Sequence, residues 1–219
     1  MKSYTIHRAK QPVPLCGDAA AGPWTSADVA AIDEYPWYKA GAKQATAARV
    51  LYDDRALYLQ FLCQDRHIFA EVTETGGNVC RDSCVEFFAT IDPARGPDYF
   101  NIETNCCGTR LMGFGPQRQG RRRLTPEQAG RIQIVTSVPG PTKAESPADQ
   151  SWWAAVAIPF DFLSEFTGVK VAPEPGTAWR ANFYRCGGKT ESQCACWNPI
   201  PWPTPDYHRP EFFGDMRFA

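Results

Sequence analysis

Short segments in which apolar and polar residues alternate recur along most of this chain, and this pattern constrains the fold more than any other feature. The segments are rich in Val, Ile, Phe, Tyr and Trp and are separated by Gly, Pro, Asn and Asp. The clearest pair is residues 45–54 and 56–65, which flank a tight turn at Asp53-Asp54-Arg55. Because β-branched and aromatic residues favour strands and these separators favour turns, this pair predicts a β-hairpin.

An extended start at residues 3–8 and further segments of the same character predict the remaining strands: residues 84–91, 99–105, 108–114, 131–138, 152–158 and 178–186. The 19 prolines disfavour long helices. Short helical pieces are expected only at Thr125-Pro126-Glu127-Gln128 and at residues 159–166. We therefore predict an all-β fold, an antiparallel β-sandwich of jelly-roll or immunoglobulin-like type with a few short helices.

Length and charge narrow the possible organisation and partners. Sandwiches commonly reach 219 residues as one unit, so we expect a single domain spanning residues 1–219 and a monomer. The 23 basic and 24 acidic residues give a net charge of -1, which offers a nucleic-acid backbone no general attraction. No apolar run approaches the roughly 18 residues of a membrane span, and the first residues lack the apolar core of a signal peptide. Neither nucleic acid nor membrane is an expected partner.

Nine cysteines are an odd number, so at least one thiol stays unpaired within the chain. Without an export signal, we expect reduced, mostly buried thiols. An alternative gathers Cys186, Cys194, Cys196 and His208 into a zinc site, since thiolates and imidazole form closed tetrahedral sites. The competing interpretation is a set of buried thiols in a compact C-terminal loop region.

Polar side chains share one face of three predicted strands. Alternation puts Phe100, Ile102 and Thr104 on one face of their strand and the polar neighbours on the other, and it leaves Glu86 outside the apolar set of its own strand. If the strands are neighbours, carboxylate, amide and guanidinium groups converge on a patch that suits sugar hydroxyls, which donate and accept hydrogen bonds. The predicted ligand-binding residues are Glu86, Asn101, Glu103, Asn105, Arg180, Asn182, Tyr184 and Trp197. The alternative is a solvated sheet face with structural tryptophans.

Six strings of residues, taken together and in this order, resemble the family 9 carbohydrate-binding modules and span roughly residues 5–218. They are residues 48–59, 81–88, 153–159, 179–185, 197–199 and 208–214. The resemblance implies a β-sandwich that binds saccharide, such as xylan or cellulose fragments, without catalysis. It also implies attachment to xylanases and other polysaccharide-degrading enzymes, and structural calcium, with no other cofactor required.

The resemblance also implies roles for single residues. Family members that bind sugar chain ends hold the ring between two tryptophans, and Trp197 is similar to the second of these, while Trp202 lies close by in sequence. Glu86 is similar to an acidic residue that contacts sugar hydroxyls. This sequence departs from the pattern twice, because Cys80 stands where the first tryptophan is expected and Cys194 where an amide is expected.

Three other functions stay open at this point. Glu86 and Glu103 could act as the paired carboxyl groups of a glycoside hydrolase, which must lie roughly 5 to 10 Å apart. A nucleophilic cysteine could be activated by His7, His67 or His208, although none lies in a recognisable motif. The chain could also be an interaction module that has lost its ligand.

Two charged features are expected to be structural. The acidic pairs Asp53-Asp54 and Asp161/Glu165 do not form an EF-hand loop and predict a turn and a helix end. The arginine-rich segment 117–123 predicts a solvated loop.

Overall fold

The computed structural model describes residues 1–219, and its chain is built mostly of β-strands. The strands are β1 (Ser3–Arg8), β2 (Ala30–Ala31), β3 (Thr46–Tyr52), β4 (Ala56–Gln64), β5 (Cys84–Thr90), β6 (Tyr99–Asn105), β7 (Arg110–Gly115), β8 (Arg122–Arg123), β9 (Gln133–Thr136), β10 (Ser151–Pro159), β11 (Ala178–Cys186), β12 (Cys194–Cys196) and β13 (Gly214–Phe218). Every predicted strand is present: β1, β6 and β11 have the predicted bounds, the others have shifted ends, and residues 131–138 shrink to β9. The sequence patterns did not predict β2, β8, β12 and β13.

Two short α-helices lie where the sequence placed them. The first, α1 (Pro126–Ala129), begins after Thr125, whose side chain accepts a hydrogen bond from the Gln128 backbone N–H. The second, α2 (Phe160–Thr167), ends at Gly168, which adopts φ 72° as a left-handed cap. Three 3-10 turns, η1 (Gly22–Ser26), η2 (Val79–Arg81) and η3 (Pro210–Phe212), lie in the connections. No helix is long and apolar enough to cross a membrane.

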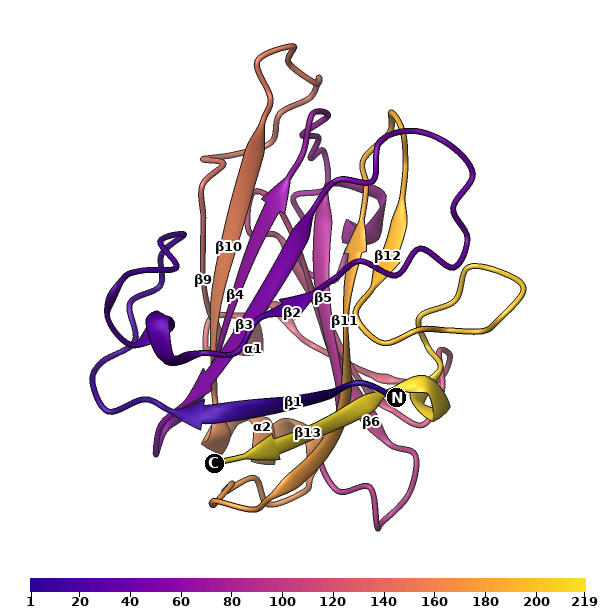
Figure 1. Cartoon of the computed structure of the whole chain (residues 1–219). Coiled ribbons are helices and arrows are strands. Elements are labelled where there is room, and N and C mark those ends of the chain that lie inside the picture. Colours follow the sequence, from indigo (N-terminus) through magenta and orange to yellow (C-terminus); the bar gives the residue numbers. More distant parts are fainter.

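The strands form one curled sheet in the order β8-β7-β6-β5-β11-β13-β1-β3-β4-β10-β9, with β12 added to β11 and β2 to β3 (Figure 1). Strand β1 runs parallel to both β13 and β3, and the other ladders are antiparallel. The sheet is therefore mixed, and the prediction of a purely antiparallel sheet is wrong at β1. Alternation reports which face a side chain occupies but carries no information on strand direction, and β1 pairs with a strand from the other end of the chain.

The main apolar core lies inside the curl of the sheet. Phe183 on β11 contacts Phe61 on β4 and Tyr4 on β1, with ring centroids 6.2 and 5.9 Å apart. Both contacts are edge-on, the geometry that aromatic quadrupoles favour. Strand β1 thus joins the two parts of the sheet, β8-β7-β6-β5-β11-β13 and β3-β4-β10-β9, which we call its two wings. The aromatic rings between the wings fix how they face each other.

The opposite face of β5, β6 and β11 is covered as well. Tyr184 on β11 stacks on Tyr207 of the C-terminal segment, residues 197–213, with centroids 4.1 Å apart and planes 11° apart. A second apolar cluster fills this layer: Val79, Cys84, Phe88, Tyr99, Leu111, Tyr184, Cys186, Cys196, Ile200, Tyr207 and Phe213. The sheet face that alternation left open to solvent or ligand is therefore largely buried.

A buried ion pair ties the two wings together at one end. Arg185 on β11 donates to Asp65, just after β4, at 2.6 Å, and the two side chains are 5% and 2% exposed. Asp65 also accepts hydrogen bonds from Ser83 Oγ at 2.8 Å and from Trp152 Nε1 at 2.9 Å. The Asp65 carboxylate thus joins β4, β10 and β11 and satisfies the buried charge of Arg185.

We predict that Asp65→Asn lowers the free energy of unfolding by about 3–5 kcal/mol, because it leaves the Arg185 guanidinium buried without a counter-charge. Urea denaturation followed by tryptophan fluorescence measures the loss. The matched control is Asp54→Asn, which removes an exposed ion pair with Arg8 and should change stability by no more than about 0.5 kcal/mol. Equal small losses in both variants would refute the role given to Asp65.

Candidate functional site

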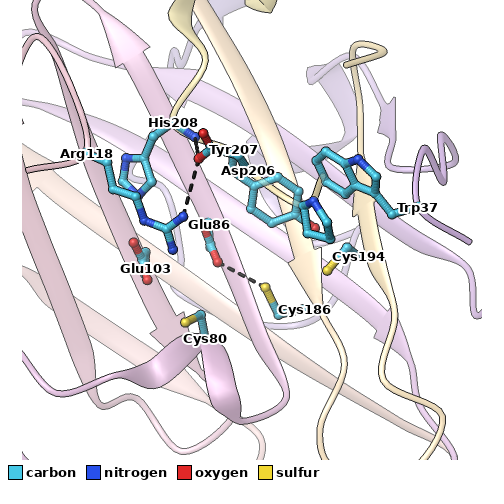
Figure 2. A pocket seen from close by; sticks show the side chains of 11 residues that line it. Trp37, Cys80, Glu86, Glu103, Arg118, Cys186, Cys194, Asp206, Tyr207 and His208 are labelled. Atoms are coloured by element: carbon cyan, nitrogen blue, oxygen red, sulfur yellow. Dashed lines mark hydrogen bonds and ion pairs between the residues drawn. The ribbon is translucent and has the colours of Figure 1, made fainter. Parts of the chain in front are cut away.

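The candidate site is a pocket of about 180 Å³ between the sheet and the segments that cover it (Figure 2). Strands β5, β6 and β11 provide its floor, and four separate connections of the chain, together with β12, provide its wall. Its lining residues are Trp37, Cys80, Glu86, Glu103, Arg118, Cys186, Cys194, Pro205, Asp206, Tyr207 and His208. The pocket is the place where the covering layer leaves the polar sheet face accessible.

Glu86 on β5 and Glu103 on β6 lie directly opposite each other on the pocket floor. Their residues are only 2% and 5% exposed. The Cys186 thiol donates to Glu86 Oε1 at 3.2 Å, and the Asn101 amide donates to Glu103 Oε1 at 2.8 Å. Because a carboxylate can accept about four hydrogen bonds, both groups retain acceptor capacity for a ligand.

Burial controls the protonation of this pair. It raises the pKa of Glu86 well above its ordinary value, and the charge of Glu103 raises it further. Burial also raises the pKa of Glu103, to about 7, against the opposing effects of the Asn101 hydrogen bond and nearby arginines. The pair therefore keeps at least one proton at neutral pH and can both donate and accept hydrogen bonds.

The wall of the pocket carries three aromatic rings. Trp37 lies 5.7 Å from Tyr207 between ring centroids, and its indole N–H donates to the Trp202 carbonyl oxygen at 2.7 Å. His208 Nδ1 is hydrogen-bonded to the Tyr99 hydroxyl at 2.7 Å. Burial, aided by nearby arginines, lowers the pKa of His208 to about 3, so this ring is neutral at ordinary pH.

The arginine-rich loop behaves differently at its two ends. Arg118 is 63% exposed at the pocket and pairs with Asp206 at 3.5 Å. Arg121 corrects the expectation of a solvated loop, since its guanidinium lies 4.1 Å from the Tyr99 ring centroid and donates to Asn101 Oδ1 at 2.8 Å. Asn101 in turn donates to Glu103, so Arg121 helps to orient a floor carboxyl group without touching the pocket.

Of the predicted ligand residues, Glu86 and Glu103 line the pocket, and Asn101 lies behind Glu103. Arg180 and Asn182 instead bind the C-terminal segment that covers the sheet. Asn182 donates to the Asn198 carbonyl oxygen at 2.9 Å, and Arg180 reaches the Phe213 carbonyl oxygen. These side chains hold the C-terminal segment on the sheet.

The remaining three predicted residues also lie outside the pocket. Asn105 donates to the Val72 carbonyl oxygen and to Asp82, which fastens the end of β6 to the connection between β4 and β5. Tyr184 is fully buried beneath Tyr207. Trp197 is 4% exposed and packs against Phe183 in the main core, with centroids 5.7 Å apart, so neither face of its ring is open to a ligand.

Sequence patterns missed most of the pocket wall. Trp37 and Asp206 lie in loops, where no periodicity indicates which way a side chain points. One positional signal did lead to the pocket, because Cys80 and Cys194, singled out by their spacing from Glu86 and Trp197, both line it.

The residues considered for metal binding do not fit a metal. No group of three or more His, Cys, Asp and Glu side chains is arranged to hold an ion, which contradicts the zinc alternative. Asp53 accepts hydrogen bonds from the backbone of its own turn, and Asp161 and Glu165 both pair with Arg131. The acidic pairs considered for calcium are thus engaged in a turn and a helix contact.

Histidine bases for a cysteine nucleophile are poorly placed. His7 pairs with Asp28 at 3.2 Å and His67 with Glu145 at 3.1 Å, both away from the pocket. His208 does line the pocket, but a pKa of about 3 makes it a weak base. The position of His208 is explained by its hydrogen bond to Tyr99, which helps to hold the C-terminal segment on the sheet, and not by activation of a nucleophile.

We predict that the free energy of unfolding falls as pH rises from about 4.5 through about 7, because Glu103 has a higher pKa in the folded protein than in the unfolded chain. Glu103→Gln should remove up to about 3 kcal/mol of this decline. Urea denaturation across pH 4.5–8 measures the difference between variant and wild type. Glu71→Gln, an exposed control, should leave the profile unchanged. Identical profiles for wild type and Glu103→Gln would contradict the assignment.

Several known proteins share this fold. A protein from Bacteroides uniformis ATCC 8492, described as a "putative carbohydrate-binding protein", superposes with a TM-score of 0.87 at 25% identity, covering 100% of this chain and 99% of that one. A family 9 carbohydrate-binding module from Caldicellulosiruptor kristjanssonii has TM-scores of 0.63 in its cellotriose complex and 0.61 in its glucose complex. These two are 14% and 13% identical and cover 99% and 98% of this chain, and 93% and 95% of theirs.

A search of curated proteins finds no sequence match to this chain. The family profile described as carbohydrate-binding family 9 matches residues 24–218, which is most of the sequence. The match includes β2 to β13 and every residue that lines the pocket. The chain belongs to carbohydrate-binding family 9.

Proposed function

We propose that this chain binds a saccharide without cleaving it, in the pocket above Glu86 and Glu103. The observation that carries the proposal is the combination of two buried carboxyl groups that keep a proton with an aromatic wall in one pocket. Sugar hydroxyls are donors and acceptors, and a carboxyl group beside a carboxylate offers both partners. The aromatic rings offer apolar faces for the C–H groups of a sugar ring.

The size of the pocket favours a single ring or the end of a chain. Its volume of about 180 Å³ is below the roughly 300–1,000 Å³ typical of sites for drug-sized ligands. The glucose and cellotriose complexes of the structural neighbours support ligands of this class. We therefore infer that the ligand is the terminal unit of an oligo- or polysaccharide, such as a cellulose or xylan fragment.

Trp37 takes the stacking role in this proposal, because Trp197 is buried in the core. One tryptophan face of about 100 Å² contributes roughly 2.5 kcal/mol by buried area, before the cost of ordering the ligand. A millimolar dissociation constant corresponds to about -4 kcal/mol. A single platform aided by two carboxyl groups therefore fits modest affinity.

The arrangement of the carboxyl groups favours binding over hydrolysis. Glu86 and Glu103 project from the same sheet face as direct cross-strand neighbours. Glycoside hydrolysis needs two carboxyl groups that flank the scissile bond. A sugar above this sheet would meet both groups from one side. The match to a carbohydrate-binding family supports a binding role, and we further propose a monomeric module that works beside a polysaccharide-degrading enzyme.

We predict that wild-type protein binds glucose and cellotriose with millimolar or tighter affinity, measured by titration calorimetry. Trp37→Ala and Glu86→Gln should each weaken binding at least about tenfold, which corresponds to 1.4 kcal/mol. Tyr38→Ala is the matched control, because this exposed neighbour of Trp37 does not line the pocket. Unchanged affinity in both pocket variants would place the sugar elsewhere, and no heat from either sugar at millimolar concentration would reject saccharide binding.

We also predict that wild type and Glu86→Gln hydrolyse aryl glycosides no faster than buffer alone. Release of the aryl group, followed by absorbance, measures the rate. Hydrolysis by wild type that is lost in Glu86→Gln would replace binding with catalysis, because it would require the Glu86 carboxyl group in the reaction.

A further inference from the structure

Three thiols line the pocket and take no part in the proposed binding of saccharide: Cys80, Cys186 and Cys194. Cys186 ends β11 and lies between two other cysteines. It is in register with Cys194 on β12 on one side and with Cys84 on β5 on the other. Cys80, Cys84, Cys186 and Cys194 are all free thiols in the structure.

The hydrogen-bond pattern distinguishes these two neighbours of Cys186. The Gly187 N–H donates to the Gln193 carbonyl oxygen at 2.8 Å, and the Trp197 N–H donates to the Phe183 carbonyl oxygen at 2.9 Å. Because hydrogen-bonded positions alternate along an antiparallel ladder, Cys186 and Cys194 form a non-hydrogen-bonded pair.

Such pairs have Cα atoms about 4.5 Å apart, within the roughly 4.4–6.8 Å that a disulfide spans. On its other edge, Cys186 forms a hydrogen-bonded pair with Cys84, in which Cα atoms lie about 5.5 Å apart and the side chains are more widely separated. The backbone therefore brings Cys194, rather than Cys84, closest to Cys186.

The ionisation of the thiols favours the same pair. The neighbouring Cys186 thiol, with help from Tyr207, lowers the pKa of Cys194 to about 7, although burial opposes the change. Burial raises the pKa of Cys84 well above its ordinary value and that of Cys80 to about 12. Because the thiolate is the reactive form, Cys194 is the thiol of the pocket that reacts first.

We propose that Cys186 and Cys194 form a reversible cross-strand disulfide when a peroxide enters the pocket. Figure 2 shows the two side chains on neighbouring strands at one side of the pocket, beside Glu86. A volume of about 180 Å³ admits an oxidant as small as hydrogen peroxide, since one water takes up about 30 Å³.

The chemistry proceeds in two steps. The Cys194 thiolate attacks one peroxide oxygen, the O–O bond breaks, and the departing hydroxide takes a proton to form water, leaving a sulfenic acid on Cys194. The Cys186 sulfur then attacks the Cys194 sulfur, and the S–O bond breaks with release of a second water. The Cys186 proton reaches the leaving oxygen by way of Glu86 Oε1, which lies 3.2 Å from the Cys186 sulfur. Two thiols lose two electrons in total, and the peroxide gains them.

The disulfide would also alter the floor of the pocket. It removes the Cys186 thiol proton, and with it the hydrogen bond that holds the pKa of Glu86 down. The oxidised protein should therefore keep Glu86 protonated to a higher pH and leave Glu86 Oε1 without the thiol donor that orients it. A resulting loss of sugar affinity rests on the proposed function, whereas the disulfide itself does not.

Peptide mapping after peroxide treatment tests the disulfide. Folded wild type is exposed to hydrogen peroxide, the peroxide is destroyed with catalase, free thiols are alkylated in denaturant, and the protein is digested with trypsin. Cleavage after Arg185 and Lys189 places Cys186 on residues 186–189 and Cys194 on residues 190–217, because Arg209 precedes Pro210 and resists cleavage. We expect these two peptides to be linked, alkylated thiols to fall from nine to seven, and dithiothreitol to restore all nine.

Residues 190–217 also contain Cys196, so variants and fragment masses identify the partner. Cys194→Ser should abolish the link and leave Cys186 open to alkylation, whereas Cys196→Ser should retain it. If Cys196→Ser fails to fold, fragmentation of the linked wild-type peptides locates the bridging cysteine. A link from Cys186 to residues 82–95, a link from Cys194 to residues 67–81, or over-oxidised Cys194 beside a free Cys186 thiol would overturn the proposal.

Titration calorimetry of the reduced and oxidised protein with glucose then separates the two proposals. A linked, oxidised protein that binds glucose at least threefold more weakly than the reduced protein supports the coupling through Glu86. If the link forms but reduced wild type binds no sugar, the proposed function fails and the disulfide stands. If sugar binds but no link forms, the disulfide fails and the proposed function stands.

Discussion

The pocket exists because the sheet that carries it is covered on both faces. One face of β11 packs into the main core through Phe183, and the other is covered by residues 197–213 through the stack of Tyr184 on Tyr207. Asn182 fastens the same segment by donating to the Asn198 carbonyl oxygen. Polar groups on a buried sheet face either form hydrogen bonds with protein groups or lie where the covering segment leaves them accessible. Most of the polar groups on this face form such hydrogen bonds, and Glu86 and Glu103 line the pocket, where the covering segment is open.

Burying two facing carboxyl groups opposes folding, since neither group ionises easily there. Perturbed acids in a pocket are typical of functional sites, where a fold tolerates such a cost. Other contacts stabilise this fold: the Asp65–Arg185 pair holds the wings of the sheet together, and the aromatic core fills the space between the wings. The pocket therefore lies in a framework whose stability comes mainly from elsewhere.

The sequence predicted the strands and their faces much better than what lies against those faces. Alternation placed Glu86 and Glu103 on one face, because strand periodicity depends only on neighbouring residues. It could not show that Tyr207 and Trp37, which lie far away in sequence, would cover that face. It therefore assigned Asn105 and Asn182 to a ligand, although both bond to protein groups. The parallel pairing of β1 escaped prediction for the same reason, since β13 comes from the other end of the chain.

A crystal structure of the reduced protein with glucose tests the central claim most directly. It should show the sugar ring in the pocket, with hydroxyl groups within hydrogen-bonding distance of the Glu86 and Glu103 carboxyl oxygens and the indole of Trp37 against the ring. Glucose bound at another surface, for example beside the exposed Trp202, with the pocket filled only by water, would contradict the account.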